Sequence, residues 1–275
     1  MAIDATTGGS NWERFKRLRE EIEKKHGKSA EQLCEEREKR VTDAIELRVP
    51  DRVPVTIQTG VFAARYAGLP LSAMYYDHAA YREACLKAVL DFEPDTGASM
   101  VLVNSGLILE LLDAKHQRWP GGNLPPDTPY QFVEGEYMKA EEYDLFLDDP
   151  SDFIFRCYLP RIYGALEPLK KLPAFRNMIG GMGLTALIGM FAAPEFKELT
   201  EKLSQVVREQ ERLSQEGAEF SDVMTYLGFP SQYGRGIGGG LGAGGIGSAP
   251  FDTISDNLRG MRGAMLDMYR CPDKL

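Results

Sequence analysis

Residues 49–57 read Val49-Pro50-Asp51-Arg52-Val53-Pro54-Val55-Thr56-Ile57. Two prolines bound a turn in this stretch, and the β-branched run that follows is typical of a buried strand. A helical pattern from His78 to Phe92 comes next, and a second strand-like run covers Ser99 to Val103. Strand, helix and strand in this order favour an α/β fold with a parallel sheet.

The residues before this stretch have a different character. Asn11 to Lys25 and Ser29 to Glu46 predict two charged helices, and Ser29 followed by Gln32 has the spacing of a capping box. We therefore divide the chain into an N-terminal helical extension, residues 1–48, and the N-terminal part of a barrel, residues 49–275.

Downstream, the sequence alternates between apolar runs and helices. Helices are expected at Ala140 to Leu147, Pro150 to Tyr158, Pro194 to Glu216 and Thr253 to Tyr269, with a long loop from Gln117 to Pro129. The methionines of the last helix, at spacings of three and four, predict a core face. We count about four or five strand-like runs, whereas a (β/α)8 TIM-type barrel needs eight strands. The expected fold is such a barrel, truncated.

Composition excludes several classes of function. The chain has 275 residues and a formal net charge of −9, with its basic residues interleaved with acids, which argues against a nucleic-acid surface. We find neither a membrane-spanning run nor a secretory leader, and the four cysteines form no CxxC pair, so we expect a cytoplasmic protein.

Two carboxylates are our candidates for catalysis, and four other residues are our candidates for substrate binding. Asp95 precedes the second strand-like run and Asp222 follows Phe220-Ser221. They are the two carboxylates selected as facing a pocket, and the alternative for each is a turn or cap role, which is common for aspartate. Between Gly234 and Ser248, repeated glycines surround Arg235 and predict a mobile loop over a substrate or a flexible linker. The three histidines lie at no metal-binding spacing, so we name no metal ligands. The substrate-binding candidates are Arg65, Arg235, Asp252 and Arg259.

Asp252 and Arg259 lie in the segment that follows the glycine-rich loop. Asp252 is placed to cap the next helix, or to bind substrate. Asp256, Arg259 and Arg262 lie within one or two turns and could pair among themselves. Alternatively, the arginines could bind substrate carboxylates, because a guanidinium offers two parallel hydrogen bonds. Gly260 and Gly263, which weaken a helix, indicate close packing at this point.

Three blocks of the sequence are similar to one family. They are Arg40-Val41-x-x-Ala44 with Pro50-Asp51-Arg52-Val53-Pro54-Val55; Tyr137-Met138-x-x-x-Glu142-Tyr143-Asp144; and Ala249-Pro250-Phe251-Asp252 with Arg259-Gly260-Met261-Arg262-Gly263 and Met265 to Leu275. Together they resemble the uroporphyrinogen decarboxylase superfamily over most of residues 38–275. The family pattern has a Gly-Arg-Tyr core after the first strand, where this chain has Arg65 as its one arginine between Ile57 and Gly68.

The resemblance implies a (β/α)8 barrel enzyme that acts on tetrapyrrole-related substrates. The first hypothesis is methyl transfer linked to a corrinoid, with zinc as cofactor if ligands lie beyond Leu275 and with a corrinoid protein as partner. The alternatives are cofactor-free decarboxylation of a uroporphyrinogen, with Arg65 holding carboxylates, and a non-catalytic corrinoid-binding protein. An incomplete barrel would expose apolar edges, so a homodimer is also expected.

Overall fold

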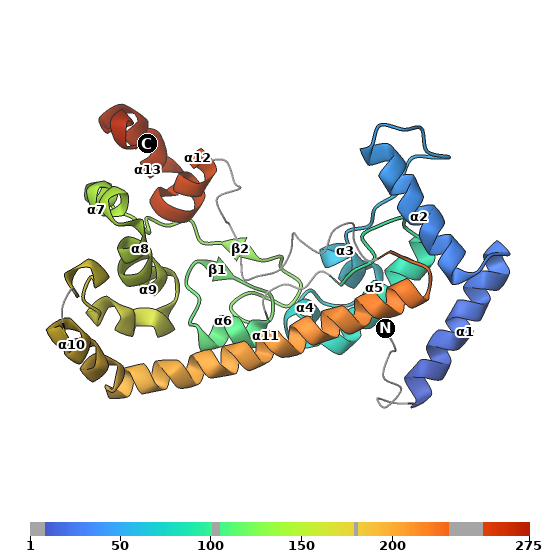
Figure 1. The fold of residues 1–275 in the computed structure, drawn as a ribbon, viewed down its shortest axis with the longest axis horizontal. Helices are drawn as coiled ribbons and strands as arrows, with labels where there is room; N and C mark the ends of the chain where they lie inside the picture. The colour runs from blue at the N-terminus through green and yellow to red at the C-terminus, as the bar shows by residue number, and fades with distance from the viewer. Residues whose placement is uncertain (1–8, 101–104, 179–180, 231–249) are drawn as a thin grey trace. The chain divides into compact units, whose positions relative to one another are not determined.

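The computed structural model describes residues 9–100, 105–178, 181–230 and 250–275, and these are mostly helical (Figure 1). The α-helices are α1 (Gly9–His26), α2 (Ala30–Ile45), α3 (Gly60–Tyr66), α4 (Ala73–Tyr76), α5 (His78–Phe92), α6 (Gly106–Leu111), α7 (Tyr143–Asp148), α8 (Pro150–Phe153), α9 (Leu159–Ile162), α10 (Gly181–Phe191), α11 (Pro194–Tyr226), α12 (Pro250–Asp252) and α13 (Gly260–Arg270). Short 3-10 or π-helical segments are η1 (Ala140–Glu142), η2 (Ile154–Tyr158), η3 (Gly164–Lys171), η4 (Phe175–Asn177), η5 (Thr253–Arg259) and η6 (Pro272–Lys274). The strands are β1 (Gln117–Arg118) and β2 (Gln131–Phe132).

The predicted barrel is wrong. Helix accounts for 68% of the structure, and the only named sheet in the described residues is the antiparallel pair β1 and β2. This pair lies at the edges of the predicted loop from Gln117 to Pro129, which is therefore the connection of a small hairpin. A parallel barrel cannot be built from it.

The strand predicted at residues 53–57 forms only one isolated parallel bridge, between Thr56 and Thr96. Strands of a parallel sheet are buried on both faces, but the side chains of Val53 and Val55 are 80% and 48% exposed. Pro54 also lacks the N–H that a central strand would donate. Of the second predicted strand, Ser99 and Met100 are not in a strand and residues 101–103 lie outside the described part of the chain.

The chain divides into two compact units, and α11 contributes residues to both. Unit 1 consists of residues 1–103 and 210–239, and unit 2 of residues 104–209 and 240–275. The division differs from the boundary that we expected between residues 48 and 49.

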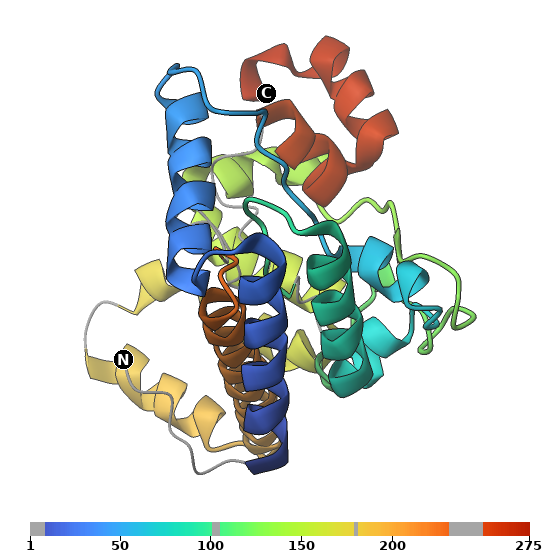
Figure 2. The same cartoon turned by 90° about the vertical axis from the view of Figure 1, so that its right-hand side faces the viewer.

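In unit 1, the two N-terminal helices pack on the end of α11 (Figure 2). Trp12 of α1 lies with its ring centroid 4.8 Å from that of Tyr226, and Arg37 of α2 lies over the Phe229 ring at 4.2 Å. Gly228, with φ of 87°, allows this approach, because a Cβ there would lie 2.8 Å from the Ala30 carbonyl oxygen. The extension is thus part of unit 1.

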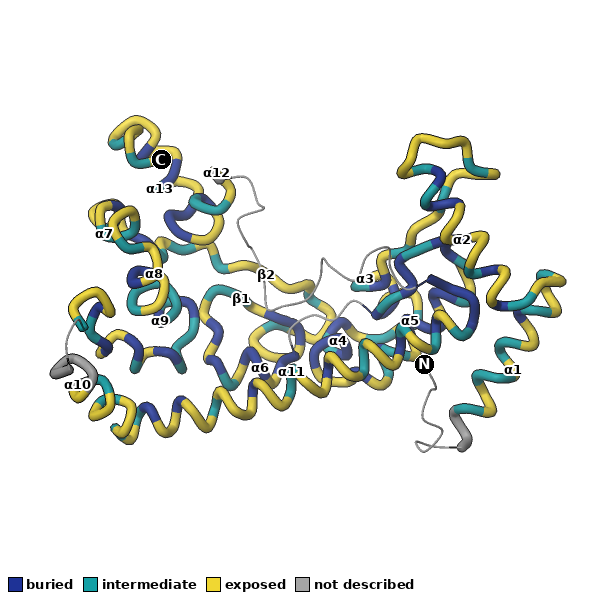
Figure 3. Tube along the Cα trace, in the orientation of Figure 1, coloured by how far each residue is buried: buried dark blue, intermediate teal, exposed yellow. Residues whose placement is uncertain are grey.

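The core of unit 1 lies between α3, α4 and α5 (Figure 3). Helix α5 has the predicted bounds, and its buried face includes Tyr81, Cys85 and Val89. Asp77 begins the helix by accepting a hydrogen bond from the backbone N–H of Ala80 at 3.0 Å. The His78 side chain is buried beside this cap, with Nδ1 3.1 Å from Nη2 of Arg212.

Two apolar clusters lie among the described residues of unit 2. One joins η3 to the start of α11 through Leu166, Leu169, Leu172, Phe196 and Leu199. The other joins Met138, α7 and α8 to η5 through Met138, Tyr143, Phe153 and Leu258. This second cluster brings residues 137–144 against residues 258–267, two segments that both carried the family resemblance.

The predicted helix from Thr253 to Tyr269 is interrupted at Gly260, where η5 ends and α13 begins. Its methionines do not form the expected core face, since Met261, Met265 and Met268 are 49%, 55% and 53% exposed. The buried side of this region is mixed instead: Arg259 and Asp267 are buried together with Leu258 and Ala264.

Candidate functional site

A cavity of about 640 Å³ lies beside α13 in unit 2, and its volume is in the range of roughly 300–1,000 Å³ that small-molecule sites occupy. We call it the α13 cavity. Segment 134–136, the start of η1 and the first turns of α13 form its walls. The lining residues are Glu134, Gly135, Glu136, Lys139, Ala140, Glu141, Arg259, Gly260, Arg262, Gly263, Leu266 and Arg270.

Arg259 anchors one wall of the cavity. Its Nε donates to Oδ2 of Asp267 at 2.6 Å, and its Nη1 donates to the Met138 carbonyl at 2.6 Å and to Glu136. Asp267, which is also buried, accepts a further hydrogen bond from the Tyr143 hydroxyl at 3.1 Å. Burial opposes the charge of Arg259, but the hydrogen bonds that it donates to Asp267 and Glu136 outweigh this effect and raise the pKa of Arg259.

Two glycines allow this arrangement, as their position in the helical pattern suggested. Gly260 has φ of 69° and ψ of 152°, a backbone conformation that is essentially restricted to glycine, and it separates η5 from α13. At Gly263, a Cβ would lie 3.4 Å from the guanidinium carbon of Arg259. The absence of a side chain therefore leaves one face of the guanidinium uncovered by α13.

Three other cations line the α13 cavity without forming an ion pair with any residue that the structure describes: Lys139, Arg262 and Arg270. Of the acids, Glu134 accepts a hydrogen bond from the backbone N–H of Met261 at 2.8 Å, and Glu136 binds Arg259. The cavity therefore has cationic groups that are available to an anion, with carboxylates close by.

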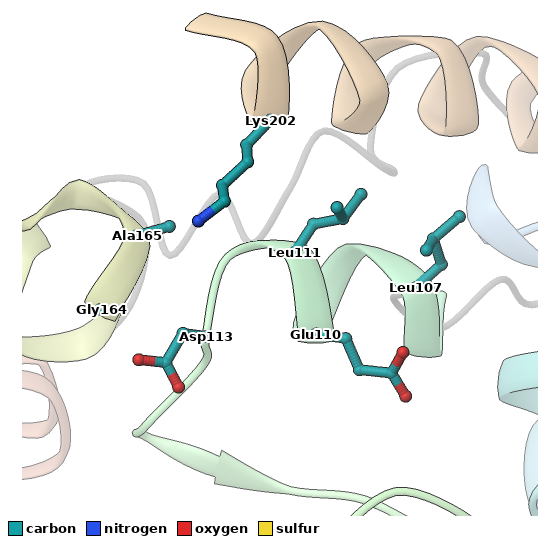
Figure 4. Close-up of a pocket in the computed structure, with 7 residues that line it drawn as sticks. All are labelled: Leu107, Glu110, Leu111, Asp113, Gly164, Ala165 and Lys202. Carbon is teal, nitrogen blue, oxygen red and sulfur yellow. The ribbon is translucent and has the colours of Figure 1, made fainter. Parts of the chain in front are cut away.

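A second, smaller cavity of about 380 Å³ lies between α6, the start of η3 and α11 in unit 2 (Figure 4). Lys202 extends into it from α11, but Lys202 forms an ion pair with Glu198 at 2.8 Å. Asp113 lies on the opposite side, close to Gly164. A Cβ added at Gly164 would lie 1.8 Å from the carboxylate of Asp113. With its lysine already paired, this cavity is the weaker candidate for an anion site.

Asp95, a predicted catalytic residue, lies in unit 1 and is completely buried. Its carboxylate accepts hydrogen bonds from Arg52 at 2.5 and 2.7 Å, from Arg40 at 2.5 Å and from the Val55 N–H at 2.7 Å. Arg40 also binds Asp51 through two bonds of 2.6 and 2.7 Å, which lower the pKa of Asp51 to about 2. The arrangement is a charge-balanced network that ties α2 to segments 51–55 and 95–97.

The other predicted site residues that the structure describes lie apart from this network and, except Arg259, outside the α13 cavity. Arg65 belongs to α3 and Asp222 is exposed on α11, both in unit 1. Asp252, in unit 2, has helical backbone angles and makes no side-chain cap, so its predicted capping role is wrong. Arg235 lies outside the described residues. Of the six candidates, the structure places Arg259 alone in the lining of this cavity.

The cysteines form no disulfide. Burial raises the pKa of Cys34 and of Cys157, and raises that of Cys85 to about 11. Each of these thiols is therefore held away from the thiolate form. No group of three or more His, Cys, Asp or Glu residues within the described ranges is arranged to hold a metal ion.

Sequence reasoning missed most of the cavity lining. Glu134, Glu136, Lys139 and Arg270 were not candidates, whereas Arg262 was considered with Arg259 as a possible partner of substrate carboxylates. A usable signal was present in Arg259-Gly260-Met261-Arg262-Gly263, where two arginines alternate with two glycines. The acidic side of the cavity comes from residues more than a hundred positions away and has no local signature.

No family model, curated protein or solved structure matches this chain. Within the described ranges, none of the helices has the length and apolar character that a membrane-spanning segment requires.

Proposed function

We propose that the chain is an enzyme of the uroporphyrinogen decarboxylase superfamily. It binds a tetrapyrrole-related ligand in the α13 cavity, where the cationic side chains hold the carboxylates of the ligand. One observation carries this proposal: Lys139, Arg262 and Arg270 line a cavity of about 640 Å³ without ion-pair partners in the described part of the chain. Guanidinium groups bind carboxylates through strong, charge-assisted hydrogen bonds. A ligand with several acetate and propionate arms fits such a wall.

Among the reactions of this superfamily, decarboxylation agrees best with the lining. The cations would hold the carboxylates that do not react, while an acetate arm loses CO2 and takes up a proton at its methylene carbon. The likeness of residues 137–144 and 249–275 to the superfamily supports the superfamily assignment and not one of its reactions, and both segments contribute to this cavity or to the adjoining apolar cluster.

Corrinoid-linked methyl transfer stays a prediction from the resemblance. That branch binds zinc through a His-x-Cys and a later Cys, which the resemblance implies would lie beyond Leu275, so the residues of this sequence give no test of zinc binding. We derive no step through zinc. A corrinoid protein partner, non-catalytic corrinoid binding and a homodimer also stay predictions.

We also propose that the protein acts in the cytoplasm. The support is its four unbonded cysteines, which are typical of a reducing compartment.

The test is a fluorescence titration of the full chain with uroporphyrin I, a stable oxidised relative of the proposed substrate, and separately with aquocobalamin. We expect saturable binding of uroporphyrin and at least tenfold weaker binding by the double variant R262A/R270A. Tenfold corresponds to about 1.4 kcal/mol, less than one charge-assisted hydrogen bond can contribute. Arg118→Ala, an exposed arginine of β1 outside the cavity, is the matched control and should bind as the unaltered chain does.

Equal uroporphyrin binding by R262A/R270A and the unaltered chain would overturn the assignment of the site. Binding of aquocobalamin without uroporphyrin would overturn the decarboxylase reading in favour of a corrinoid. Release of CO2 from uroporphyrinogen by the unaltered chain, and its loss in the double variant, would support the enzyme assignment.

A further inference from the structure

The two carboxylates that accept hydrogen bonds from Arg259 differ in their exposure to solvent. Its side chain is only 4% exposed, and Asp267, the partner of Nε, is 1% exposed. Glu136, a partner of Nη1, is 57% exposed and lines the α13 cavity. Arg259 is therefore held from beneath by a buried carboxylate and covered on the cavity side by a carboxylate that remains in contact with water.

The two carboxylates differ in what their removal would cost. Taking Asp267 away would leave a buried guanidinium without its compensating charge, which is strongly destabilising. Moving Glu136 into solvent costs much less, because its carboxylate is already largely hydrated and the Met138 carbonyl still accepts from the same Nη1 at 2.6 Å. Glu136 is thus the exchangeable partner of Arg259.

The cavity also reaches Arg259 from the side of α13. Both Arg259 and Gly263 line it, and Gly263 places no side chain over the guanidinium. A carboxylate that enters the cavity can therefore approach Arg259 in the region that Glu136 now occupies. Arg262 and Arg270 line the same cavity and favour the entry of a negative charge.

We infer that Glu136 holds the place of a ligand carboxylate on Arg259, so that a dicarboxylate or polycarboxylate binds in the α13 cavity by displacing Glu136. This inference rests on the proposed function for the identity of the natural ligand, but the exchange itself requires only a carboxylate. Glu136 is then an intramolecular competitor that lowers the affinity of the site and excludes weak monoanions.

The exchange makes a directional prediction for one substitution. Glu136→Gln removes the competing negative charge while keeping the length of the side chain and a hydrogen-bond acceptor. We expect E136Q to bind both succinate and uroporphyrin I at least tenfold more tightly than the unaltered chain, measured by isothermal titration calorimetry. The matched control is Glu141→Gln, which removes one charge from the same cavity but none from Arg259, and should change either affinity less than threefold.

A thermal melt of each variant establishes that it is folded. A second test of ligand access to Arg259 is the substitution Gly263→Ala. An alanine methyl at this position would lie 3.4 Å from the guanidinium carbon of Arg259 and cover the face that Gly263 leaves open. We expect G263A to weaken succinate binding severalfold. Unchanged succinate affinity in both E136Q and G263A, or equal tightening in E136Q and E141Q, would overturn the inference.

The two ligands separate this inference from the proposed function. If succinate binding tightens in E136Q while uroporphyrin binds to no form of the protein, the exchange stands and the tetrapyrrole assignment fails. If uroporphyrin binds, is lost in R262A/R270A and is unaffected in E136Q, the proposed function stands and the exchange at Arg259 fails.

Discussion

Asp95 and Arg52 form a two-bonded ion pair in which the carboxylate is completely buried and the guanidinium is half-exposed, with N to O distances of 2.5 and 2.7 Å. Arg40 binds the same carboxylate from the buried side. This geometry indicates that Asp95 stabilises unit 1, whereas a catalytic role was predicted for it from the sequence.

Asp95→Asn should therefore destabilise the protein. Arg40 and Arg52 both bind the Asp95 carboxylate and would lose its negative charge. Removing one member of a buried ion pair lowers the free energy of unfolding by about 3–5 kcal/mol. Chemical denaturation monitored by circular dichroism measures this. Asp222→Asn, at an exposed position of α11, is the control and should change stability by less than about 0.5 kcal/mol. A stable D95N protein that has lost activity would restore the catalytic reading.

Gly260→Ala and Gly263→Ala should have opposite effects on stability. Gly260 has φ of 69° and ψ of 152°, where an alanine is strained by about 1–3 kcal/mol even though its Cβ would meet nothing closer than 3.6 Å. Gly263 lies inside α13, where alanine is the better helix former by up to about 1 kcal/mol. Melting temperatures of the two variants check this. A destabilised G263A would mean that the guanidinium of Arg259 cannot accept the added methyl.

Stability should fall at alkaline pH, in part through Cys85. Burial raises the pKa of Cys85 from an ordinary value of 9.0 to about 11, so the folded state keeps the proton that the unfolded state releases. The contribution of this thiol is complete below pH 9 and is lost as the pH rises toward 11, by about 1.4 kcal/mol per pH unit. Cys85→Ala should show a correspondingly flatter decline of unfolding free energy over this window. Parallel declines for the two proteins would contradict a buried, protonated thiol.

Ser29→Ala should weaken the start of α2. Ser29 accepts from the N–H of Gln32 at 3.3 Å, and Gln32 accepts from the N–H of Ser29 at 3.0 Å, which confirms the predicted capping box. Loss of such a cap costs about 1 kcal/mol. Ser204→Ala, within the exposed face of α11, offers a comparison, because its hydroxyl bonds only to the Thr200 carbonyl one turn earlier. Equal stabilities of the two variants would show that the cap contributes nothing measurable.

The helices were predictable because their signals are local. The bounds of α5 and the cap of α2 depend on residues three or four positions apart, and these contacts form wherever the helix forms. The predicted strands depended on partners that the local pattern does not specify. Val55 and Thr56 contact Asp95 and Thr96, but exposure of Val53 and Val55 leaves that pairing as a single bridge and not a sheet.

The family-like blocks also show that local sequence patterns did not determine the tertiary fold. Their residues do meet in space, since Arg40 binds Asp51 in the first block and Arg259 of the third binds the Met138 carbonyl of the second. That proximity did not require the barrel that the resemblance implied, because ion pairs and short helical segments supply it here. The methionines of α13 failed as a core prediction for a related reason: the inward face of α13 is occupied by Asp267, which balances Arg259.

The sequence by itself determined where the long helices begin, the acidic character of the chain and the presence of an arginine and glycine motif at residues 259–263. Only the tertiary structure decided that Arg259 would be buried against Asp267 and covered by Glu136, a residue 123 positions away, and that Lys139, Arg262 and Arg270 would line one cavity. The reason is physical. Helix caps and helical periodicity are set by contacts within one or two turns, whereas the charge balance of a cavity depends on which distant segments bury their side chains together.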